Sequence, residues 1–478
     1  MSNKADTVFK DNYSEGGSAA DCLQAIPELL ASRFNTESPR AYVRTFGCQS
    51  NVADSEIIQG FLELSGFALT QSPEDAHLII FNTCAIREHA QDRVFGNVGA
   101  VKKYKTKQPS PFIALCGCMM QQDYVVKKIR KNYPFVDLIF GPNAISELPF
   151  LLYRLLKGEK RLISTPPEKS IIEEGLPLKR DSNFKAFLPV MYGCDNFCSY
   201  CVVPLVRGRE RSREPQAVIK EAEALVKAGY KDITLIGQNV NSYGKNMHFD
   251  YTFAKLLESI NAVPGDFLIR FMTSHPKDCG KDLLDTMARC EKVTKHLHLP
   301  FQSGSDSVLK AMNRGYTRQN YLSLIEYAKK VMPELSVTGD VIVGFPGETE
   351  DDFEETLDLI EQVRFTSLYT FIFSPRKGTV AYRLEDNTPR EDKVKRFQRL
   401  INLQEGIAAE RAQTMIGCEY RVLCENRIEA EGLKIEGRTQ GNVIIEFEAE
   451  PSVIGTFQNV RVTEAKNWLL KGEMLKDK

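Results

Sequence analysis

The sequence has no long apolar run. No segment reaches the roughly 20 consecutive apolar residues that a membrane-spanning helix needs, and the best candidate, LPFLLYRLL, is short and interrupted by Arg154. The amino-terminal stretch MSNKADTVFKDNYSEGG is polar and lacks the apolar core of a secretory signal. We therefore expect a cytoplasmic protein that makes no use of a membrane.

An excess of charge of either sign is also missing. Lys and Arg total 62 and Asp and Glu total 63, so the formal net charge is −1. The chain as a whole is therefore no electrostatic binder of nucleic acid, and any contact with RNA or DNA must come from a local patch. Repeats and low-complexity tracts are absent as well. The composition, with 42% hydrophobic and 26% charged residues, is typical of a globular protein.

The 478 residues are enough for about three domains. Residues 1–38 are polar and rich in small residues, which predicts a loosely ordered extension. Strand-like and helical segments alternate over 39–157, so we expect an amino-terminal α/β domain with a parallel sheet. The polar, proline-bearing stretch 158–183 is typical of a linker.

The alternation resumes over 184–410, where six strand candidates are separated by helical stretches. This pattern favours a partial (β/α)6 barrel over a short open sheet. Short strands with turn residues between them fill 411–478 and predict a small β-barrel or sandwich. The predicted fold class is therefore α/β with an added all-β domain.

Cysteine is the informative residue type, and the chain has twelve. In the cytoplasm thiols stay reduced, so clustered cysteines indicate metal ligands or reactive groups. The stretch MYGCDNFCSYCVVP places Cys194, Cys198 and Cys201 directly after the first strand of the central domain. Three thiolates suit a 4Fe–4S cluster with one iron left open. The alternatives are a zinc knuckle with a distant fourth ligand or incidental cysteines.

Three further cysteines each follow a predicted strand of the amino-terminal domain. They are Cys48 in TFGCQSN, Cys84 in FNTCAIRE and Cys118 in ALCGCMMQ. Because the carboxyl ends of parallel strands share one edge, we expect the three thiols to converge. Cys116 lies close by, but Cys118 is the better candidate because it lies past the strand. A free cysteine is usually a small buried hydrophobe, and we keep that interpretation for Cys22, Cys279, Cys290, Cys418 and Cys424.

The CxxxCxxC spacing of Cys194, Cys198 and Cys201 resembles the motif of radical S-adenosylmethionine (SAM) enzymes. The other trio resembles the amino-terminal domain of the methylthiotransferases, a radical SAM subfamily that carries two 4Fe–4S clusters. The terminal strands look like a TRAM domain, an RNA-binding module. The blocks FNTCAIREHA, YGCDNFCSYCVVPLVRGRERSR and LIGQNVNSYG are most similar to the branch that modifies tRNA.

This resemblance implies a radical enzyme with two SAM-dependent steps. It would add a methylthio group to C2 of N6-isopentenyladenosine at position 37 of tRNA, next to the anticodon. One cluster would cleave SAM to a radical, and the other would carry or supply the sulfur. The two trios would be catalytic through these clusters: Cys194, Cys198 and Cys201 hold the first, and Cys48, Cys84 and Cys118 the second.

Polar residues at later strand ends match the positions that cradle SAM in the family, namely Gln238, Asn239, Ser274, Gln302 and Ser303. Each of these taken alone is equally well a helix cap or a turn residue, as is His275. For RNA contact the sequence offers LVRGRERSR, with Arg207, Arg209, Arg211 and Arg213. Interleaved glutamates make a solvated, ion-paired segment an equal alternative there.

The resemblance also implies partners. They are the tRNA substrate, an electron donor such as a flavodoxin or ferredoxin, and proteins that deliver iron–sulfur clusters or sulfur to a monomeric enzyme. The residues by themselves also allow two other functions. One is a methylthiotransferase acting on a ribosomal protein side chain, and the other is a non-catalytic, zinc-bearing RNA-binding protein.

Overall fold

The computed structural model describes residues 19–85, 88–167, 172–248, 250–428, 433–466 and 469–475. The chain forms two compact units. Unit 1 comprises 1–181, 192–195 and 202–211, and unit 2 comprises 182–191, 196–201 and 212–478. Across the described residues, no helix is both long enough and apolar enough to cross a bilayer.

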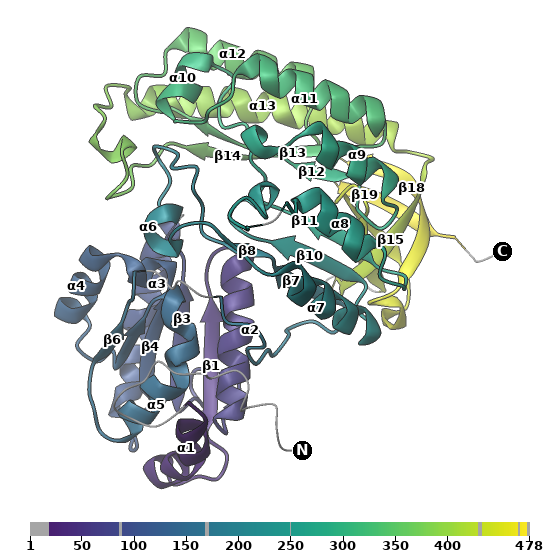
Figure 1. Ribbon diagram of the computed structural model, residues 1–478. Helices are drawn as coiled ribbons and strands as arrows, with labels where there is room; N and C mark the ends of the chain where they lie inside the picture. The colour runs from purple at the N-terminus through teal and green to yellow at the C-terminus, as the bar shows by residue number, and fades with distance from the viewer. Residues whose placement is uncertain are drawn as a thin grey trace. The chain divides into compact units, whose positions relative to one another are not determined.

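Unit 1 is built on a six-stranded sheet in which every pair of neighbours is parallel, as predicted (Figure 1). The strand order is β2-β1-β3-β4-β5-β6. The strands are β1 (Arg40–Thr45), β2 (Ala68–Leu69), β3 (Leu78–Thr83), β4 (Phe112–Gly117), β5 (Leu138–Phe140) and β6 (Leu162–Ser164). The helices are α1 (Ala19–Phe34), α2 (Gln49–Leu64), α3 (Glu88–Val101), α4 (Asp123–Asn132) and α5 (Leu148–Leu156), with 3-10 turns η1 (Lys102–Thr106), η2 (Cys118–Gln121) and η3 (Pro142–Glu147).

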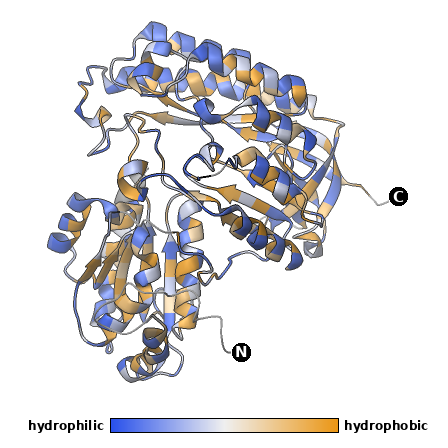
Figure 2. Cartoon of the chain, viewed as in Figure 1, coloured by the Kyte–Doolittle hydropathy of each residue, from blue (hydrophilic) through white to orange (hydrophobic). Residues whose placement is uncertain are grey.

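The central strands β3, β4 and β5 of the unit 1 sheet are buried on both faces, which is why they are mostly apolar. Side chains alternate across a strand, so Leu78 and Ile80 pack with α1, α2 and α5 on one face. Ile79 and Phe81 pack with α3 and α4 on the other. Figure 2 shows the result, with mostly hydrophobic strands between helices of mixed hydropathy.

The register of this sheet aligns the carboxyl ends of three neighbouring strands. Thr45 on β1 lies opposite Asn82 on β3, and Thr83 on β3 lies opposite Gly117 on β4. Cys84 and Cys118 are therefore the next residues on two adjacent strands. Cys48 follows β1 after a short turn.

Two of the predicted boundaries need correction. The extension predicted for 1–38 includes helix α1, whose Ile26 and Leu30 are fully buried in the unit 1 core; residues 1–18 lie outside the described residues. The linker predicted for 158–183 includes β6, which pairs with β5 and completes the sheet. Residues 168–171 lie outside the described part of the chain. Local polarity misled both predictions, because each segment is held by a few buried side chains or by backbone pairing.

Unit 2 contains the partial barrel. Its parallel strands form two three-stranded sheets, in the orders β11-β10-β7 and β12-β13-β14, linked by a bridge between Ile269 and Val293 (Figure 1). The strands are β7 (Lys185–Pro189), β10 (Asp232–Ile236), β11 (Leu268–Phe271), β12 (His296–His298), β13 (Ser336–Val343) and β14 (Ser367–Ile372). The helices are α7 (Pro215–Lys227), α8 (Phe253–Asn261), α9 (Lys281–Arg289), α10 (Asp306–Ala311), α11 (Arg318–Val331), α12 (Glu350–Val363) and α13 (Arg390–Thr414). All six predicted strands are present.

The carboxyl-terminal strands close into a small barrel in the order β15-β16-β17-β19-β18. They are β15 (Glu419–Arg427), β16 (Lys434–Thr439), β17 (Ile444–Glu448), β18 (Phe457–Lys466) and β19 (Leu469–Met474). The sequence pattern predicted the first four but not β19. The segment LLKGEM carries a glycine and charged residues that disfavour a strand by themselves, and it becomes one through pairing with β17 and β18.

The turn between β16 and β17 contacts the amino ends of the central strands. Arg270 on β11 donates to the backbone carbonyls of Thr439 at 3.0 Å and Gln440 at 3.3 Å. The same guanidinium forms a buried ion pair with Asp232 on β10 at 2.6 Å. The small barrel therefore closes the end of the central barrel opposite to its carboxyl strand ends.

Candidate functional site

The three cysteines at the strand ends of unit 1 converge, as expected. Both Cys48 Sγ and Cys118 Sγ lie 3.8 Å from Asn51 Oδ1. The thiol of Cys48 also hydrogen-bonds to that of Cys84. Asn51 is itself held by its amide NH2, which donates to the Phe46 carbonyl at 3.0 Å and the Thr83 carbonyl at 2.9 Å. One buried side chain thus gathers thiols that are up to 70 residues apart in the sequence.

Two glycines make room for this convergence. Gly47 has φ +119°, and a Cβ there would overlap the Cys84 Cβ and lie 2.9 Å from its Sγ. Gly117 has φ +91°, and a Cβ there would overlap atoms of Asn82 and Thr83. Both positions need the conformational freedom and the small size of glycine. They bring the turns after β1 and β4 close to the end of β3.

The thiols of this trio have unequal acidities. The hydrogen bond from Cys84, together with the charge of Arg207, lowers the pKa of Cys48 to about 5. Burial raises the pKa of Cys118 to about 11, against the opposing charge of Arg207. Cys116 is fully buried in the core shared with α1, α2 and α5, and burial raises its pKa well above the usual value. The structure therefore supports Cys118, not Cys116, as the third member of the trio.

Arg207 joins this group from the segment that follows the other cysteine trio. Its Nε donates to Cys118 Sγ at 3.0 Å, and its Nη2 donates to Asn51 Oδ1 at 3.1 Å. Both of its Nη atoms contact the Asp54 carboxylate, at 3.3 and 2.6 Å. The guanidinium is buried, and so is Asp54. Val202 and Val206 pack beside Cys118 and Ala85, which fixes helix α6 (Val203–Arg207) in unit 1.

The thiols of this trio are ligands for a soft metal centre. Within the described residues, no group of three or more His, Cys, Asp or Glu side chains is close enough to hold one metal ion. A tetrahedral zinc, with Zn–S bonds of about 2.3 Å, keeps its sulfurs about 4 Å apart. A four-iron cluster binds its thiolates through separate irons and so spreads them more widely. Three soft thiolates at one sheet edge suit zinc or an iron–sulfur cluster by the chemistry of their sulfurs.

The other trio lies in the loop between β8 (Met191–Tyr192) and α6. Gly193, with φ +75°, opens it, and a Cβ there would overlap the Arg209 carbonyl. In unit 1 the Cys194 amide donates to the Gly208 carbonyl at 3.3 Å. In unit 2 the Cys201 amide donates to the Cys198 carbonyl at 3.0 Å, and Cys198 Sγ accepts from Arg314 at 3.3 Å. Sequence reasoning missed Arg314, which gave no motif signal.

Buried polar atoms without a partner in the described structure gather at the carboxyl strand ends of unit 2. They are Asn239 Oδ1 after β10, Ser274 Oγ after β11 and Gln302 Oε1 after β12, together with the side-chain amide of Asn241 and His275 Nε2. A buried polar group without a hydrogen bond is costly, so such a group of atoms indicates a place where water or a ligand supplies the missing bonds. Asn239, Ser274 and Gln302 are among the predicted SAM-cradling residues.

His275 contributes a donor to this place. Its Nδ1 accepts from the Lys277 amide at 3.2 Å, so the proton of the neutral ring must sit on Nε2. Burial, with the nearby charges of Arg314 and Lys277, lowers the pKa of His275 to about 2, so the ring stays neutral. The Nδ1 atom of His275 therefore acts in the turn, as one interpretation of the sequence predicted. The Nε2–H has no partner in the described structure and is available as a donor.

The remaining two predicted SAM residues differ from these. Ser303 Oγ lies 3.3 Å from Thr356 Oγ1 and accepts from the Ser305 amide at 3.2 Å. Its hydroxyl therefore has a structural role in the turn before α10. Gln238 is half-buried after β10 and keeps its predicted place at the strand end.

The predicted RNA-binding arginines divide into two classes. Arg207 and Arg213 are buried, and Arg213 pairs with Glu221 at 2.9 Å and donates to the Pro189 carbonyl at 2.7 Å. Burial contradicts RNA contact by these two, whose charges are already used inside the protein. Arg209 is exposed and pairs with Asp195 at 2.7 Å, and Arg211 is half-exposed.

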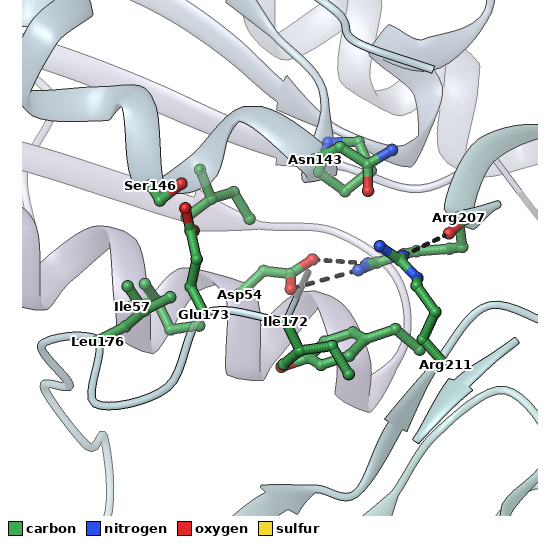
Figure 3. A pocket seen from close by; sticks show the side chains of 12 residues that line it. Asp54, Ile57, Asn143, Ser146, Ile172, Glu173, Leu176, Arg207 and Arg211 are labelled. Atoms are coloured by element: carbon green, nitrogen blue, oxygen red, sulfur yellow. Dashed lines mark hydrogen bonds and ion pairs between the residues drawn. The ribbon is translucent and has the colours of Figure 1, made fainter. Parts of the chain in front are cut away.

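A small pocket in unit 1 borders the same arginine segment (Figure 3). Asp54 and Arg207 line it, with Arg211 and Asn143 beside them and Ile57 among its apolar residues. Its volume is about 80 Å³. Sites for small molecules are usually about 300–1,000 Å³, so this pocket holds a few waters rather than a nucleoside.

Comparison with known families covers most of the chain. The Radical SAM superfamily matches residues 188–360, the Uncharacterized protein family UPF0004 matches 40–141, and the TRAM domain matches 413–475. The first match contains Cys194, Cys198 and Cys201, and the second contains Cys48, Cys84 and Cys118.

Full-length relatives are also similar. The chain is 45% identical over 465 residues to the "tRNA-2-methylthio-N(6)-dimethylallyladenosine synthase" of Caldicellulosiruptor saccharolyticus, covering 97% of this chain and 98% of that protein. It is 47% identical over 435 residues to the protein of the same name from Thermoanaerobacter sp., covering 91% and 92%.

Among solved structures, the radical S-adenosylmethionine methyltransferase TsrM from Kitasatospora setae, with tryptophan substrate and a SAM analogue bound, has a similar fold. Its TM-score is 0.53 at 13% identity, covering 83% of this chain and 79% of that one. At this identity the likeness concerns the fold alone.

Proposed function

The chain belongs to the tRNA-2-methylthio-N(6)-dimethylallyladenosine synthase family of radical SAM enzymes, and on this premise we propose that it places a methylthio group on C2 of N6-isopentenyladenosine at position 37 of tRNA. The observation that carries the proposal is the convergence of Cys48, Cys84 and Cys118 in unit 1. A radical SAM domain alone needs one cysteine trio. A second trio supports an enzyme that also handles sulfur.

Two 4Fe–4S clusters are the proposed cofactors, together with SAM. Cys48, Cys84 and Cys118 would ligate one cluster, and the CxxxCxxC cysteines the other. When bound, the clusters and SAM supply the radical and the sulfur chemistry that protein side chains lack. The aromatic C2–H of the adenine has no useful acidity, so acid–base catalysis by side chains would not suffice.

The chain's own residues would position these groups. Asn239, Asn241, Ser274, His275 and Gln302 would hold SAM, because their buried polar atoms lack partners that a bound molecule would provide. The His275 Nε2–H would donate to an acceptor on SAM. Arg314 would hold the Cys198 sulfur in place and bring positive charge to that cluster.

The tRNA would meet the chain through local cations and through the terminal barrel. The match to the TRAM domain supports this barrel as part of the RNA contact. Arg209 and Arg211 are the remaining candidates beside the radical cluster. Further proposed partners are a flavodoxin- or ferredoxin-like electron donor and proteins that deliver sulfur or clusters, with the enzyme acting as a cytoplasmic monomer.

The proposed domain limits are 184–410 for the radical SAM domain and 411–478 for the RNA-binding barrel, while the cluster-binding domain predicted for 39–157 also includes α1 and β6.

The test is anaerobic turnover of the reconstituted full chain with isopentenylated tRNA, SAM and reductant. Both 5′-deoxyadenosine and the 2-methylthio nucleoside should form, the latter detected by mass spectrometry. The matched control is the Cys84→Ala variant, which should still form 5′-deoxyadenosine but no methylthio product. Formation of 5′-deoxyadenosine without any modified tRNA by the unaltered chain would contradict the proposed reaction.

A further inference from the structure

Arg207 stands apart from the other arginines of its segment. It is buried, and it comes only six residues after Cys201. The three residues that its guanidinium contacts are buried as well. Its side chain contacts a sulfur of the strand-end trio, the Asn51 amide that lies beside two thiols of that trio, and one buried carboxylate. Neither the family motif nor the local charge pattern indicates this role.

The contacts of Arg207 match the geometry by which a guanidinium acts on a thiolate-bound centre. Nε lies 3.0 Å from Cys118 Sγ, and the opposite edge of the guanidinium forms a two-point pair with Asp54 at 3.3 and 2.6 Å. Both edges of the planar guanidinium are used. Asp54 fixes its orientation through the two Nη atoms, and the Nε–H points at the sulfur. A lysine has a point charge and lacks such a fork.

Charge and hydrogen bonding at a ligating sulfur set the reduction potential of an iron–sulfur cluster. A positive charge stabilises the reduced cluster, which carries one more negative charge. An N–H···S bond acts in the same direction, because it withdraws electron density from the sulfur. Burial strengthens both effects, since little water is present to screen them.

We propose that Arg207 is the positioning residue of the strand-end cluster, holding Cys118 in place and raising that cluster's reduction potential through its Nε–H···S bond and its buried charge. Asp54 orients the guanidinium and partly neutralises it, so it moderates the effect. The inference rests on the proposed function only in that Cys48, Cys84 and Cys118 hold a cluster. A single segment of chain, residues 201–207, then carries both a ligand of the radical cluster and the electrostatic partner of the other cluster.

The experiment isolates the strand-end cluster. In the full chain, Cys194, Cys198 and Cys201 are all replaced by alanine, and the protein is reconstituted anaerobically. Iron content and the reduction potential of the remaining cluster are then measured, the latter by titration followed by electron paramagnetic resonance. Absence of iron from this protein would contradict the proposed cluster at Cys48, Cys84 and Cys118, which is a different failure from that of Arg207.

Two variants in this background move the potential in opposite directions. Arg207→Gln should shift it to more negative values, because both the charge and the N–H···S bond are lost. Asp54→Asn should shift it to more positive values, because the guanidinium stays near Cys118 while its counter-charge is removed. Arg209→Gln is the matched control, since Arg209 is exposed and pairs with Asp195, and it should leave the potential unchanged.

An unchanged potential in Arg207→Gln at equal iron content would overturn the proposal. If Arg207→Gln fails to hold iron, the Asp54→Asn variant decides, and an unchanged or more negative potential there would overturn the proposal equally. If Arg207 only positioned Cys118 and had no electrostatic effect, Arg207→Gln would lower the iron content. The two variants would then not shift the reduction potential in opposite directions, and the electrostatic part of the proposal would be overturned.

Discussion

Three cysteines at adjacent strand ends form the proposed second set of cluster ligands in this chain. Register places Cys84 and Cys118 side by side, and Asn51 holds the thiol of Cys48 within reach of both. Cys116 lies on β4 and packs in the apolar core, whereas Cys118 follows the strand in η2. A spacing of two residues thus separates a proposed ligand position from a packing position.

Alanine substitution should separate these two cysteines. Cys118→Ala should abolish the strand-end cluster and lower the iron content of the reconstituted chain by about four atoms, the content of one 4Fe–4S cluster. Cys116→Ala should keep its iron, because it only removes one buried sulfur from a core, at a stability cost of about 1 kcal/mol. Iron analysis with ultraviolet–visible spectra measures both. Equal iron loss in the two variants would refute the assignment.

Ser274 gives a second prediction at this scale. Its buried hydroxyl has no partner in the described structure, so Ser274→Ala removes an unsatisfied group and should raise the free energy of unfolding by about 1 kcal/mol. SAM affinity should fall in the same variant, because the hydroxyl is proposed to bind SAM. Denaturant unfolding and equilibrium binding of SAM measure the two effects. Ser303→Ala, whose hydroxyl is already bonded, should instead lose stability.

Strand β12 shows how an element can bury titratable groups. His296 and His298 lie on the same side of the strand, and both hydrogen-bond to Thr338 Oγ1, at 2.9 and 3.0 Å. Burial lowers the pKa of His296 to about 3 and that of His298 to about 4. Leu297, between them, packs in the core of unit 2.

These depressed pKa values predict acid sensitivity. Below pH 6.5 the unfolded chain binds protons at both histidines while the folded chain does not. The contribution of these two neutral histidines to the free energy of unfolding is therefore complete above pH 6.5 and is lost as the pH falls toward 4. Each histidine should contribute a slope of about 1.4 kcal/mol per pH unit in that window. The double variant His296→Gln/His298→Gln should show a shallower fall of melting temperature between pH 7 and pH 5. Parallel pH profiles of variant and unaltered chain would refute this.

The contact between the terminal barrel and β11 is the second prediction at the scale of elements. Arg270→Met leaves Asp232 buried without its ion pair and removes two bonds to the β16–β17 turn. The expected loss is about 3–5 kcal/mol of unfolding free energy. Arg421→Met, which breaks the exposed pair with Asp266, is the control and should cost less than about 1 kcal/mol. Urea unfolding measures both, and similar losses would contradict the prediction.

For the whole molecule, a net charge of −1 provides no overall attraction to RNA, so the proposed tRNA binding must depend on local groups of cations. The variants Arg209→Gln and Arg211→Gln each remove one positive charge. Each should weaken tRNA binding and reduce the slope of log affinity against log salt concentration by about one. Arg213→Gln should leave that slope unchanged, because Arg213 is buried against Glu221. Filter binding at several salt concentrations measures all three. Equal slope changes in the three variants would show that burial does not decide which arginine contacts RNA.

Local sequence patterns predicted most of the secondary structure and one of the two cysteine trios. The hydrophobic periodicity predicted the alternating strands and helices of both α/β regions, because that period reflects the burial of one or two faces. The spacing of Cys194, Cys198 and Cys201 lies within one loop, so it is visible without any knowledge of the fold. The strands of the terminal barrel were also recognisable, except β19, which depends on its neighbours.

Contacts between segments that are distant in sequence are visible only in the folded structure. Strand order and register bring Cys48, Cys84 and Cys118 together, and the packing of α6 turns Arg207 from a supposed RNA contact into a buried partner of Cys118. The same holds for Arg314 at Cys198 and for Arg270 at the β16–β17 turn. Residue types and short spacings record local geometry, whereas the charge that a buried side chain feels is set by groups far away in sequence, and only tertiary packing decides which groups those are.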